Sequence, residues 1–258
     1  MGEKIRSFFL EIIFVASVYF VLLLIVFLVS LLKLFGRFKE IEQEPFPQNA
    51  KGLIISMNHQ DGNEWFFVYP KFFRLRYLIM PWSILGEFPY AMADKSNFYR
   101  SIIARPFLLR IMPVDRQSGD KTEQMVLVRK CVELLKLGAV IIGFFEGTRT
   151  WKAKAKLSSK LKDRPLGQLH ESLGLMAKLS SSGVKSAWME FPGMSFHSLT
   201  EEGHFSLIRF LWWYWKILFG QNGRIVLVWG LTQRFNGQSR EEITRAAVES
   251  LLALADVA

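Results

Sequence analysis

The chain has 258 residues, of which 50% are hydrophobic, 14% aromatic and 22% charged, which fits one globular domain and excludes a disordered or low-complexity protein. Lysine and arginine exceed aspartate and glutamate by 33 to 23, so the net charge of +10 favours an anionic partner, either nucleic acid or a membrane surface. Its single cysteine, Cys131, excludes an intrachain disulfide and a cysteine-based zinc site.

The N-terminal segment is the strongest membrane signal. Residues 12–32 carry no formal charge, and as a helix they would be roughly 30 Å long, about the thickness of the hydrocarbon core of a bilayer. A cleaved signal peptide has a shorter apolar region, about 7–15 residues, and a small-residue cleavage site. We therefore predict a retained membrane helix within an anchor of residues 1–40, ahead of a globular domain of residues 41–258. A cleaved signal and a buried core helix are the alternatives.

Charges at the two ends of this segment predict its orientation. Lys4 and Arg6 precede it, whereas Lys33, Arg37 and Lys39 follow it. Because cytoplasmic flanks carry the excess of cations, the globular domain is expected on the cytoplasmic face.

Strand and helix patterns alternate through the rest of the chain. In chain order they predict a strand at 52–57, a helix at 63–73, a strand at 77–80, a helix at 98–111 that Pro106 interrupts, an extended piece at 112–115, a helix at 120–137, a strand at 139–144, a helix at 168–182, strands at 184–191 and 224–230, and a last helix that opens with a capping box of Ser239 and Glu242. Met125, Val128, Val132 and Leu135 should form the buried face of the helix at 120–137. The alternation predicts an α/β fold, with a mixed, mostly parallel central sheet flanked by helices.

Two further segments have unusual compositions. Residues 205–219 are rich in tryptophan, and suit a helix that lies in a membrane interface or lines an acyl-chain slot. They equally suit a core helix whose cations, Arg209 and Lys216, reach solvent. Residues 152–164 are strongly basic, which fits either a solvated loop or a patch for phosphate headgroups or an acidic carrier.

His59 is the first candidate for chemistry, because it directly follows the buried strand at 52–57. In open α/β sheets, the carboxyl ends of strands line the ligand crevice. A histidine oriented by a carboxylate can act as the general base for a hydroxyl group, and both Asp61 and Glu64 are close in sequence.

A second candidate, residues 143–150 (GFFEGTRT), follows the buried strand at 139–144. Gly147 permits a tight turn, Thr148 offers a hydroxyl donor, and Arg149 offers a guanidinium that matches a phosphate group. Arg116 follows the extended piece at 112–115 in the same way. Two arginines near strand ends favour a phosphate-bearing substrate.

These segments, in this order and spacing, resemble the glycerolipid acyltransferases typified by 1-acylglycerol-3-phosphate acyltransferase. The family's N-H-x-x-x-x-D motif corresponds to residues 58–64, its F-I-D-R motif to 112–116, and its F-P-E-G-T-R-S motif to 144–150. The chain departs from the pattern in having Glu64 for the usual aspartate and Phe145 for the usual proline, and in the basic stretch at 152–164. The family's fourth motif matches residues 188–193 only weakly, and no site is assigned there.

The resemblance implies a membrane-bound O-acyltransferase of phospholipid synthesis, with residues 41–258 as the acyltransferase domain. It would transfer an acyl group from acyl-CoA or acyl carrier protein to the hydroxyl of a lysophosphatidate-type acceptor, giving phosphatidic acid. His59 would be the base and Glu64 its partner, with Asp61 as the rival. The resemblance implies no metal and no further cofactor, and it assigns acceptor binding to Arg116, Glu146, Gly147, Thr148 and Arg149. For Glu146, a role in bracing the loop is the alternative to contact with the acceptor.

Two alternatives remain at this stage. The acceptor could be another lipid, such as a lysophospholipid, an amino lipid or a glycolipid precursor. The chain could also be a catalytically silent lipid-binding relative, as the changes at Glu64 and Phe145 would allow. A nucleic-acid partner is not expected, because no nucleic-acid-binding motif is present and a membrane helix opposes it.

Overall fold

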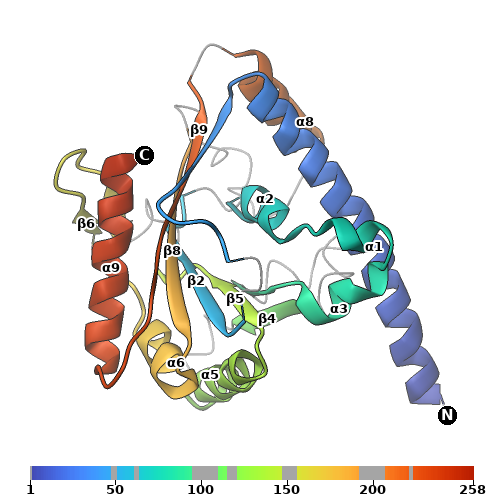
Figure 1. Ribbon diagram of the computed structural model, residues 1–258, viewed down its shortest axis with the longest axis horizontal. Helices are drawn as coiled ribbons and strands as arrows, with labels where there is room; N and C mark the ends of the chain where they lie inside the picture. Colours follow the sequence, from blue (N-terminus) through green and yellow to red (C-terminus); the bar gives the residue numbers. More distant parts are fainter. Residues whose placement is uncertain are drawn as a thin grey trace.

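A seven-stranded sheet with helices on both faces forms the body of the protein (Figure 1). The structure, a computed structural model, describes residues 2–47, 51–60, 64–94, 110–114, 121–146, 156–191, 207–220 and 223–258. The order of strands in the sheet is β1-β9-β8-β2-β5-β3-β4. These strands are β1 Phe38–Glu42, β2 Leu53–Met57, β3 Tyr90–Asp94, β4 Ile111–Val114, β5 Val140–Gly143, β8 Gly183–Glu190 and β9 Ile225–Gln233. Among the described strands of this sheet, only β8 and β9 pair antiparallel, so the predicted α/β fold with a mixed, mostly parallel sheet is confirmed.

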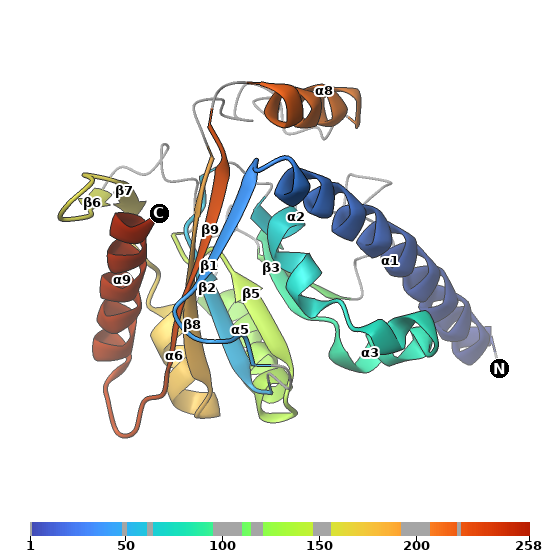
Figure 2. The same cartoon turned by 45° about the horizontal axis from the view of Figure 1, so that its top comes forward.

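The helices divide between the two faces of the sheet (Figures 1 and 2). One hydrophobic cluster contains side chains of α1, α2 and α8, and a second contains side chains of α5, α6 and α9. The helices are α1 Gly2–Leu34, α2 Glu64–Val68, α3 Ile84–Glu87, α5 Lys121–Lys136, α6 Ser172–Ser180, α8 Leu207–Phe219 and α9 Arg240–Val257, with 3₁₀ turns η1 Tyr69–Phe72, η2 Leu75–Leu78 and η3 Pro81–Ser83.

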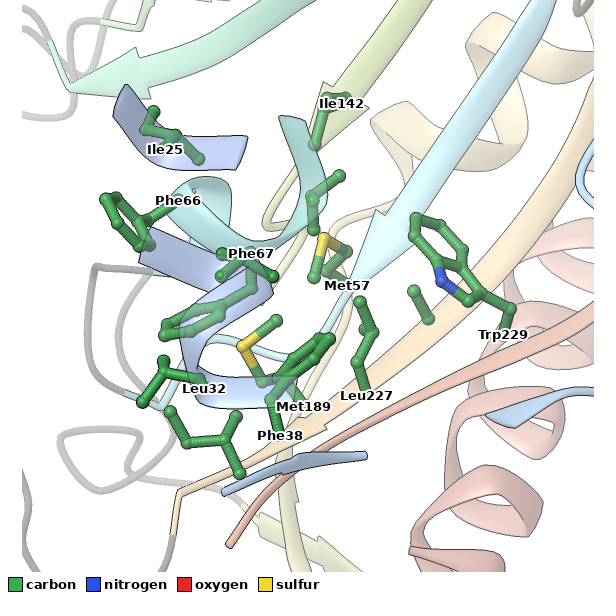
Figure 3. Close-up of a cluster of buried hydrophobic side chains, with 14 of the residues drawn as sticks. Ile25, Leu32, Phe38, Met57, Phe66, Phe67, Ile142, Met189, Leu227 and Trp229 are labelled. Atoms are coloured by element: carbon green, nitrogen blue, oxygen red, sulfur yellow. The ribbon is translucent and has the colours of Figure 1, made fainter. Parts of the chain in front are cut away.

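Burial on both faces explains the uninterrupted apolar strands. Leu53, Ile55 and Met57 of β2 point into the cluster with α1, whereas Ile54 between them points into the cluster with α5 and α6. Figure 3 shows the first of these clusters, where Met57 and Ile142 of the sheet meet helical side chains. A strand that is covered on both sides favours apolar residues at nearly every position, which is the pattern in β2 apart from Ser56.

Most of the predicted elements are confirmed. The segments at 52–57, 139–144, 184–191 and 224–230 form β2, β5, β8 and β9, and β4 covers the described part of 112–115. α5 and α6 form where helices are predicted, and the α-helix expected at 63–73 changes to a 3₁₀ turn at Tyr69, next to Pro70. Both hydrogen bonds of the capping box at Ser239 and Glu242 are present at the start of α9. The helix expected at 98–111 lies almost wholly outside the described residues.

Two expectations about elements are wrong, and two strands were not predicted. Residues 77–80 are not a strand: Tyr77 is buried within η2, and a short apolar run does not distinguish a strand from a helical turn. The next strand along the chain is β3, which was not predicted. β1 was also not predicted, because charged residues dominate this edge strand and only Phe38 is fully buried. Met125 is exposed, because the packing of α5 begins one turn later, at Leu127 and Val128.

The basic segment contains regular structure. Its described part begins with β6, Lys156–Ser158, which forms an antiparallel hairpin with β7, Pro165–Gly167. The carboxylate of Asp256 accepts hydrogen bonds from the backbone of Leu161 and Lys162, which ties the turn of this hairpin to the last helix.

The N-terminal helix is confirmed as long and apolar. Among the described residues, Glu11–Leu34 of α1 is the one segment with the length and apolarity to cross a membrane, with a mean hydropathy of 3.2. β1 follows after a turn and pairs with β9 in the sheet. The boundary that the sequence predicts at residue 40, between the anchor and the globular domain, therefore lies within this strand.

A buried lysine fastens the chain after β1 to the sheet. The Lys185 side chain in β8 is fully buried, and its Nζ donates to the Gly230 carbonyl oxygen at 2.6 Å and to Glu44 Oε1 at 2.9 Å. Glu44 Oε1 also accepts from the backbone N–H and the hydroxyl of Thr232. The hydrogen bonds from Thr232 and Lys185 lower the pKa of Glu44 from 4.5 to about 2.

This contact predicts an acid-dependent loss of stability. Because its pKa is lowered in the folded state, Glu44 stabilises the protein above pH 4.5, and the contribution is lost as the pH falls from 4.5 toward 2. Glu44→Gln should lower the melting temperature at pH 7, and the difference from wild type should shrink across this window. The control is Glu249→Gln, which replaces an exposed acid of α9 and should follow the wild-type curve. If the melting temperatures of wild type and Glu44→Gln changed equally with pH, the assignment to Glu44 would be contradicted.

Candidate active site

The candidate site lies where β2, β5 and β8 end. β2 pairs in parallel with both neighbours, so Ser56 lies beside Gly143 of β5 and Met57 lies beside Ala187 of β8. The residues that follow β2 and β5 therefore leave the same edge of the sheet. This is the convergence that the sequence predicts for His59 and residues 144–146.

Asn58 sets the direction in which the chain leaves β2. Its side-chain amide donates to the carbonyl oxygen of Met189 at 2.8 Å, and its Oδ1 accepts from the Met189 N–H at 2.7 Å. Asn58 is fully buried, so both bonds are shielded from water. They continue the pairing of β2 with β8 for one residue and hold the backbone immediately before His59.

Glu146 holds the backbone of His59 from the other side. Its Oε1 accepts from the His59 N–H at 2.6 Å, and its Oε2 accepts from the Gly167 N–H at 2.6 Å. The side chain is only 7% exposed. The structure thus gives Glu146 a bracing role between the histidine and the β6–β7 hairpin, and the acceptor contact that the resemblance implies for it stays a prediction.

The imidazole of His59 faces a buried carboxylate. Nδ1 of His59 lies 3.5 Å from Oε2 of Glu64, the first residue of α2. The Glu64 side chain is fully buried, whereas the His59 side chain keeps 14% of its exposure. A distance of 3.5 Å exceeds that of a normal hydrogen bond, but such contacts are often long without substrate. Glu64 therefore has the geometry of an orienting partner, and Asp61 lies outside the described residues.

Phe144 is a site residue that sequence reasoning missed. Its ring stacks on the imidazole of His59, with centroids 4.4 Å apart and planes at 25°. This contact limits rotation of the imidazole on one of its faces. The only signal in the sequence was its place two residues before Glu146, because a phenylalanine at the end of a buried strand is usually part of the core.

Phe145, which replaces the proline of the family pattern, points into the core on the α5–α6 side of the sheet. A side chain at Gly143 would lie 2.6 Å from its ring, so this glycine makes room for the phenylalanine. The Phe145 carbonyl oxygen accepts from the His170 N–H at 2.7 Å. The loop that follows β5 is therefore held by the Phe145 side chain in the core and by the bond to His170, and His59 and Glu64 remain in contact.

Several predicted residues cannot be placed. Arg116, Gly147, Thr148 and Arg149 lie outside the described residues, so their roles stay predictions. β4, which precedes Arg116, is an edge strand separated from β5 by β3. Within the described part of the chain, no group of three or more His, Cys, Asp or Glu side chains could hold a metal ion.

The β6–β7 hairpin is connected to this edge at two points. One is the Gly167–Glu146 hydrogen bond, and the other is an ion pair between Arg164 in the hairpin turn and Glu190 at the end of β8. Part of the predicted basic insertion thus supports the loop that holds His59.

The bridge made by Asn58 can be tested by stability. Asn58→Ala leaves the N–H and carbonyl of Met189 without this partner, and should lower the free energy of unfolding by about 2–4 kcal/mol, measured by denaturant titration in detergent. Ser56→Ala is a matched control, because Ser56 is fully buried two residues earlier, in β2, and its hydroxyl has no hydrogen-bond partner among the described residues. If both variants lost equal stability, the bridge would not be the cause.

Comparisons with known proteins give a match to the fold. Neither a protein-family model nor a curated protein sequence matches the chain. Among solved structures, it is similar to the 1-acyl-sn-glycerophosphate (LPA) acyltransferase PlsC from Thermotoga maritima, with a TM-score of 0.50 and 16% sequence identity. The match covers 98% of this chain and 97% of that one. The chain therefore has the fold of a glycerolipid acyltransferase, and the resemblance that the three motifs predict is confirmed at the level of the fold.

Proposed function

We propose that the protein is a membrane-bound O-acyltransferase that moves a fatty acyl group from an acyl thioester to the hydroxyl of a lysophosphatidate-type acceptor. The observation that carries the proposal is the buried Glu64 carboxylate 3.5 Å from Nδ1 of His59, at the strand edge of a fold shared with an LPA acyltransferase. A silent lipid-binding relative would not need a base with a buried partner.

In the proposed reaction, His59 acts as the general base. Nε2 takes the proton of the acceptor hydroxyl while the oxygen attacks the thioester carbonyl carbon. The carbon–sulfur bond then breaks, and the imidazolium returns the proton to the leaving thiolate. Glu64 favours the imidazolium and holds the ring, as a triad carboxylate does. Phe144 and Glu146 keep the ring and backbone of His59 in place for both steps.

Acceptor and donor are assigned from charge. Arg116 and Arg149 would hold the acceptor phosphate, with Gly147 and Thr148 forming the loop around it. The donor would be acyl-CoA or acyl carrier protein, both of which are acidic. Lys160 and Lys162 are exposed on the turn of the β6–β7 hairpin, which supports docking of an acidic donor beside the site. The product would be phosphatidic acid, made on the cytoplasmic face of the membrane.

The first test is acyl transfer by detergent-solubilised protein from a labelled thioester to a panel of acceptors. Lysophosphatidate should accept the acyl group, and His59→Ala should lower the rate at least about 100-fold, because a general base contributes on that scale. Arg149→Ala should raise the KM for lysophosphatidate and have little effect with neutral lysophospholipids or amino lipids. Transfer only to another acceptor would move the substrate and keep the mechanism. The absence of His59-dependent transfer to any acceptor would overturn the proposal.

The partner of His59 can be tested separately. Glu64→Ala should lower kcat about 100-fold with little change in KM, whereas Glu64→Asp, which keeps a carboxylate, should retain most of the activity. Glu249→Gln is the control, because it removes an exposed acid of α9, which packs on the opposite face of the sheet from α2. If Glu64→Ala were fully active and Asp61→Ala inactive, the dyad would be His59 with Asp61.

A further inference from the structure

Arg37 and Arg224 lie at the edge of the sheet that carries the candidate site. Arg37 directly precedes β1, and Arg224 directly precedes β9. β1 runs parallel to β9, and β9 runs antiparallel to β8, so that Val226 lies beside Glu190, the last residue of β8. The starts of β1 and β9 are therefore at the same edge as the ends of β8 and β2.

The two arginines are neighbours across the ladder between β1 and β9. The Ile225 N–H donates to the carbonyl oxygen of Arg37 at 2.8 Å, so the residues that precede the two strands lie side by side. Lys39, an exposed residue of β1, adds a third cation. Arg37, Lys39 and Arg224 together form what we call the cationic patch.

No acid balances the cationic patch within the described part of the chain. None of its three side chains forms an ion pair or a hydrogen bond to a described residue, and the Nε atom of Arg37 is buried without a partner there. Glu40, an acid of the same strand, pairs instead with Lys33 and Lys71. Like charges that are held together without an acid favour the binding of an anion.

The Arg37 guanidinium is also not needed to cap α1. Carbonyl oxygens in the last turn of this helix accept hydrogen bonds from the backbone N–H groups of residues 35–37. Arginine side chains near a helix C-terminus often supply such bonds, but here the backbone supplies them. The donors of the guanidinium therefore remain available to a ligand.

α8 ends beside the cationic patch (Figure 1). The ring of Phe219 lies 6.0 Å from the ring of Phe35, in the turn before β1. Trp213 of α8 is buried in the core, whereas Trp215 is exposed. The core interpretation of residues 205–219 is thus confirmed for one face of the helix, and contact of the other face with a membrane stays a prediction. Lipid headgroups are therefore one competing source of phosphate for the patch.

The register of the sheet gives the distance between the patch and His59. Neighbouring strands lie about 4.8 Å apart, and a strand rises about 3.3 Å per residue. Arg224 is two strands away from His59 and three residues further along the strand direction. The Cα atoms of these two residues are therefore about 14 Å apart, and Arg37, one strand further, is about 17 Å from His59.

This distance separates the phosphate of the acceptor from that of the donor. In lysophosphatidate, roughly four bonds join the hydroxyl oxygen to phosphorus, which is about 5 Å at about 1.2 Å per bond in an extended chain. In acyl-CoA and in acyl carrier protein, roughly 13 bonds of the phosphopantetheine arm join the thioester sulfur to phosphorus, which is about 16 Å. The arm of the donor spans the distance to the patch, whereas the acceptor phosphate falls well short of it.

We infer that the cationic patch binds the phosphate at the head of the donor's phosphopantetheine arm, while the thioester at the other end of the arm lies at His59. The inference deepens the proposed function and rests on it. It gives donor and acceptor separate anion sites on opposite sides of β2. β9 and β1 lie on one side, whereas β5 and β4, the strands that precede Arg149 and Arg116, lie on the other.

The first test is calorimetric titration of the detergent-solubilised protein with CoA, phosphopantetheine and pantetheine. CoA and phosphopantetheine should bind, and pantetheine, which lacks the phosphate, should bind about tenfold more weakly. Arg37→Gln and Arg224→Gln should each weaken the binding of CoA about tenfold and leave the binding of pantetheine unchanged, because hydrogen bonds to charged groups contribute on that scale. Arg37→Lys keeps the charge and should retain most of the affinity, which distinguishes loss of charge from misfolding.

The matched control is Arg234→Gln, which removes an exposed arginine directly after β9, at the opposite edge of the sheet, and should bind CoA like wild type. Unchanged CoA affinity in both Arg37→Gln and Arg224→Gln would overturn the inference. So would variants that keep their CoA affinity but no longer bind vesicles of phosphatidylglycerol, because the patch would then bind lipid headgroups.

Kinetics separate the donor from the acceptor. Arg224→Gln should raise the KM for palmitoyl-CoA about tenfold and leave the KM for lysophosphatidate unchanged. Palmitoyl-acyl carrier protein should show the same rise, because its phosphate is equally far from the sulfur. A rise in the KM for lysophosphatidate alone would place the acceptor at the patch and overturn the inference. A rise confined to the carrier protein would also overturn it, because the patch would then contact the protein surface of the carrier.

Binding is also measured with His59→Ala, which should bind CoA like wild type. Phosphate-dependent binding of CoA without transfer to any acceptor would contradict the proposed reaction and not the anion site. Transfer that depends on His59 but not on Arg37 or Arg224 would overturn the anion site and not the reaction. Failure of the inference and failure of the proposed function are thus separate results.

Discussion

The candidate site depends on the need of buried backbone groups for hydrogen-bond partners where parallel strands end. Beyond the last ladder hydrogen bond, backbone groups still need partners, and in a buried position water cannot supply them. Asn58 and Glu146 satisfy this need with side-chain atoms, and in doing so they hold the backbone on both sides of the bond between residues 58 and 59. The position of His59, and hence its contact with Glu64, follows from these polar contacts.

Glu146 also connects the site to a part of the chain that looks peripheral in the sequence. Its second oxygen holds Gly167 of the β6–β7 hairpin, whose turn is in turn held by Glu190 and Asp256. The hairpin that contains the described part of the basic stretch is therefore connected to the histidine through Glu146. The contacts of Glu146 with His59 and Gly167 give this residue a structural role that does not require contact with substrate.

The N-terminal helix α1 packs in the hydrophobic core and is also apolar enough, over Glu11–Leu34, to cross a membrane. Ile25, Val29 and Leu32 share one hydrophobic cluster with the strands of the sheet, so removing α1 would expose that cluster (Figure 3). A helix that is apolar on all sides can pack one face on the protein core while its other face remains suitable for contact with lipid. Hydropathy alone measures the sum of both faces and cannot separate them.

The sequence by itself determined the α/β fold and the position of His59, because strands buried on both faces are continuously apolar and the motifs follow directly after them. It also indicated Glu64, on family spacing. Only the tertiary structure decided that Phe144 stacks on His59, that Glu146 braces backbone, and that β1 joins the sheet as an edge strand. Those facts depend on contacts between residues far apart in the chain, such as His59 with Glu146 and Phe38 with Ile225, and local periodicity contains no information about such distant partners.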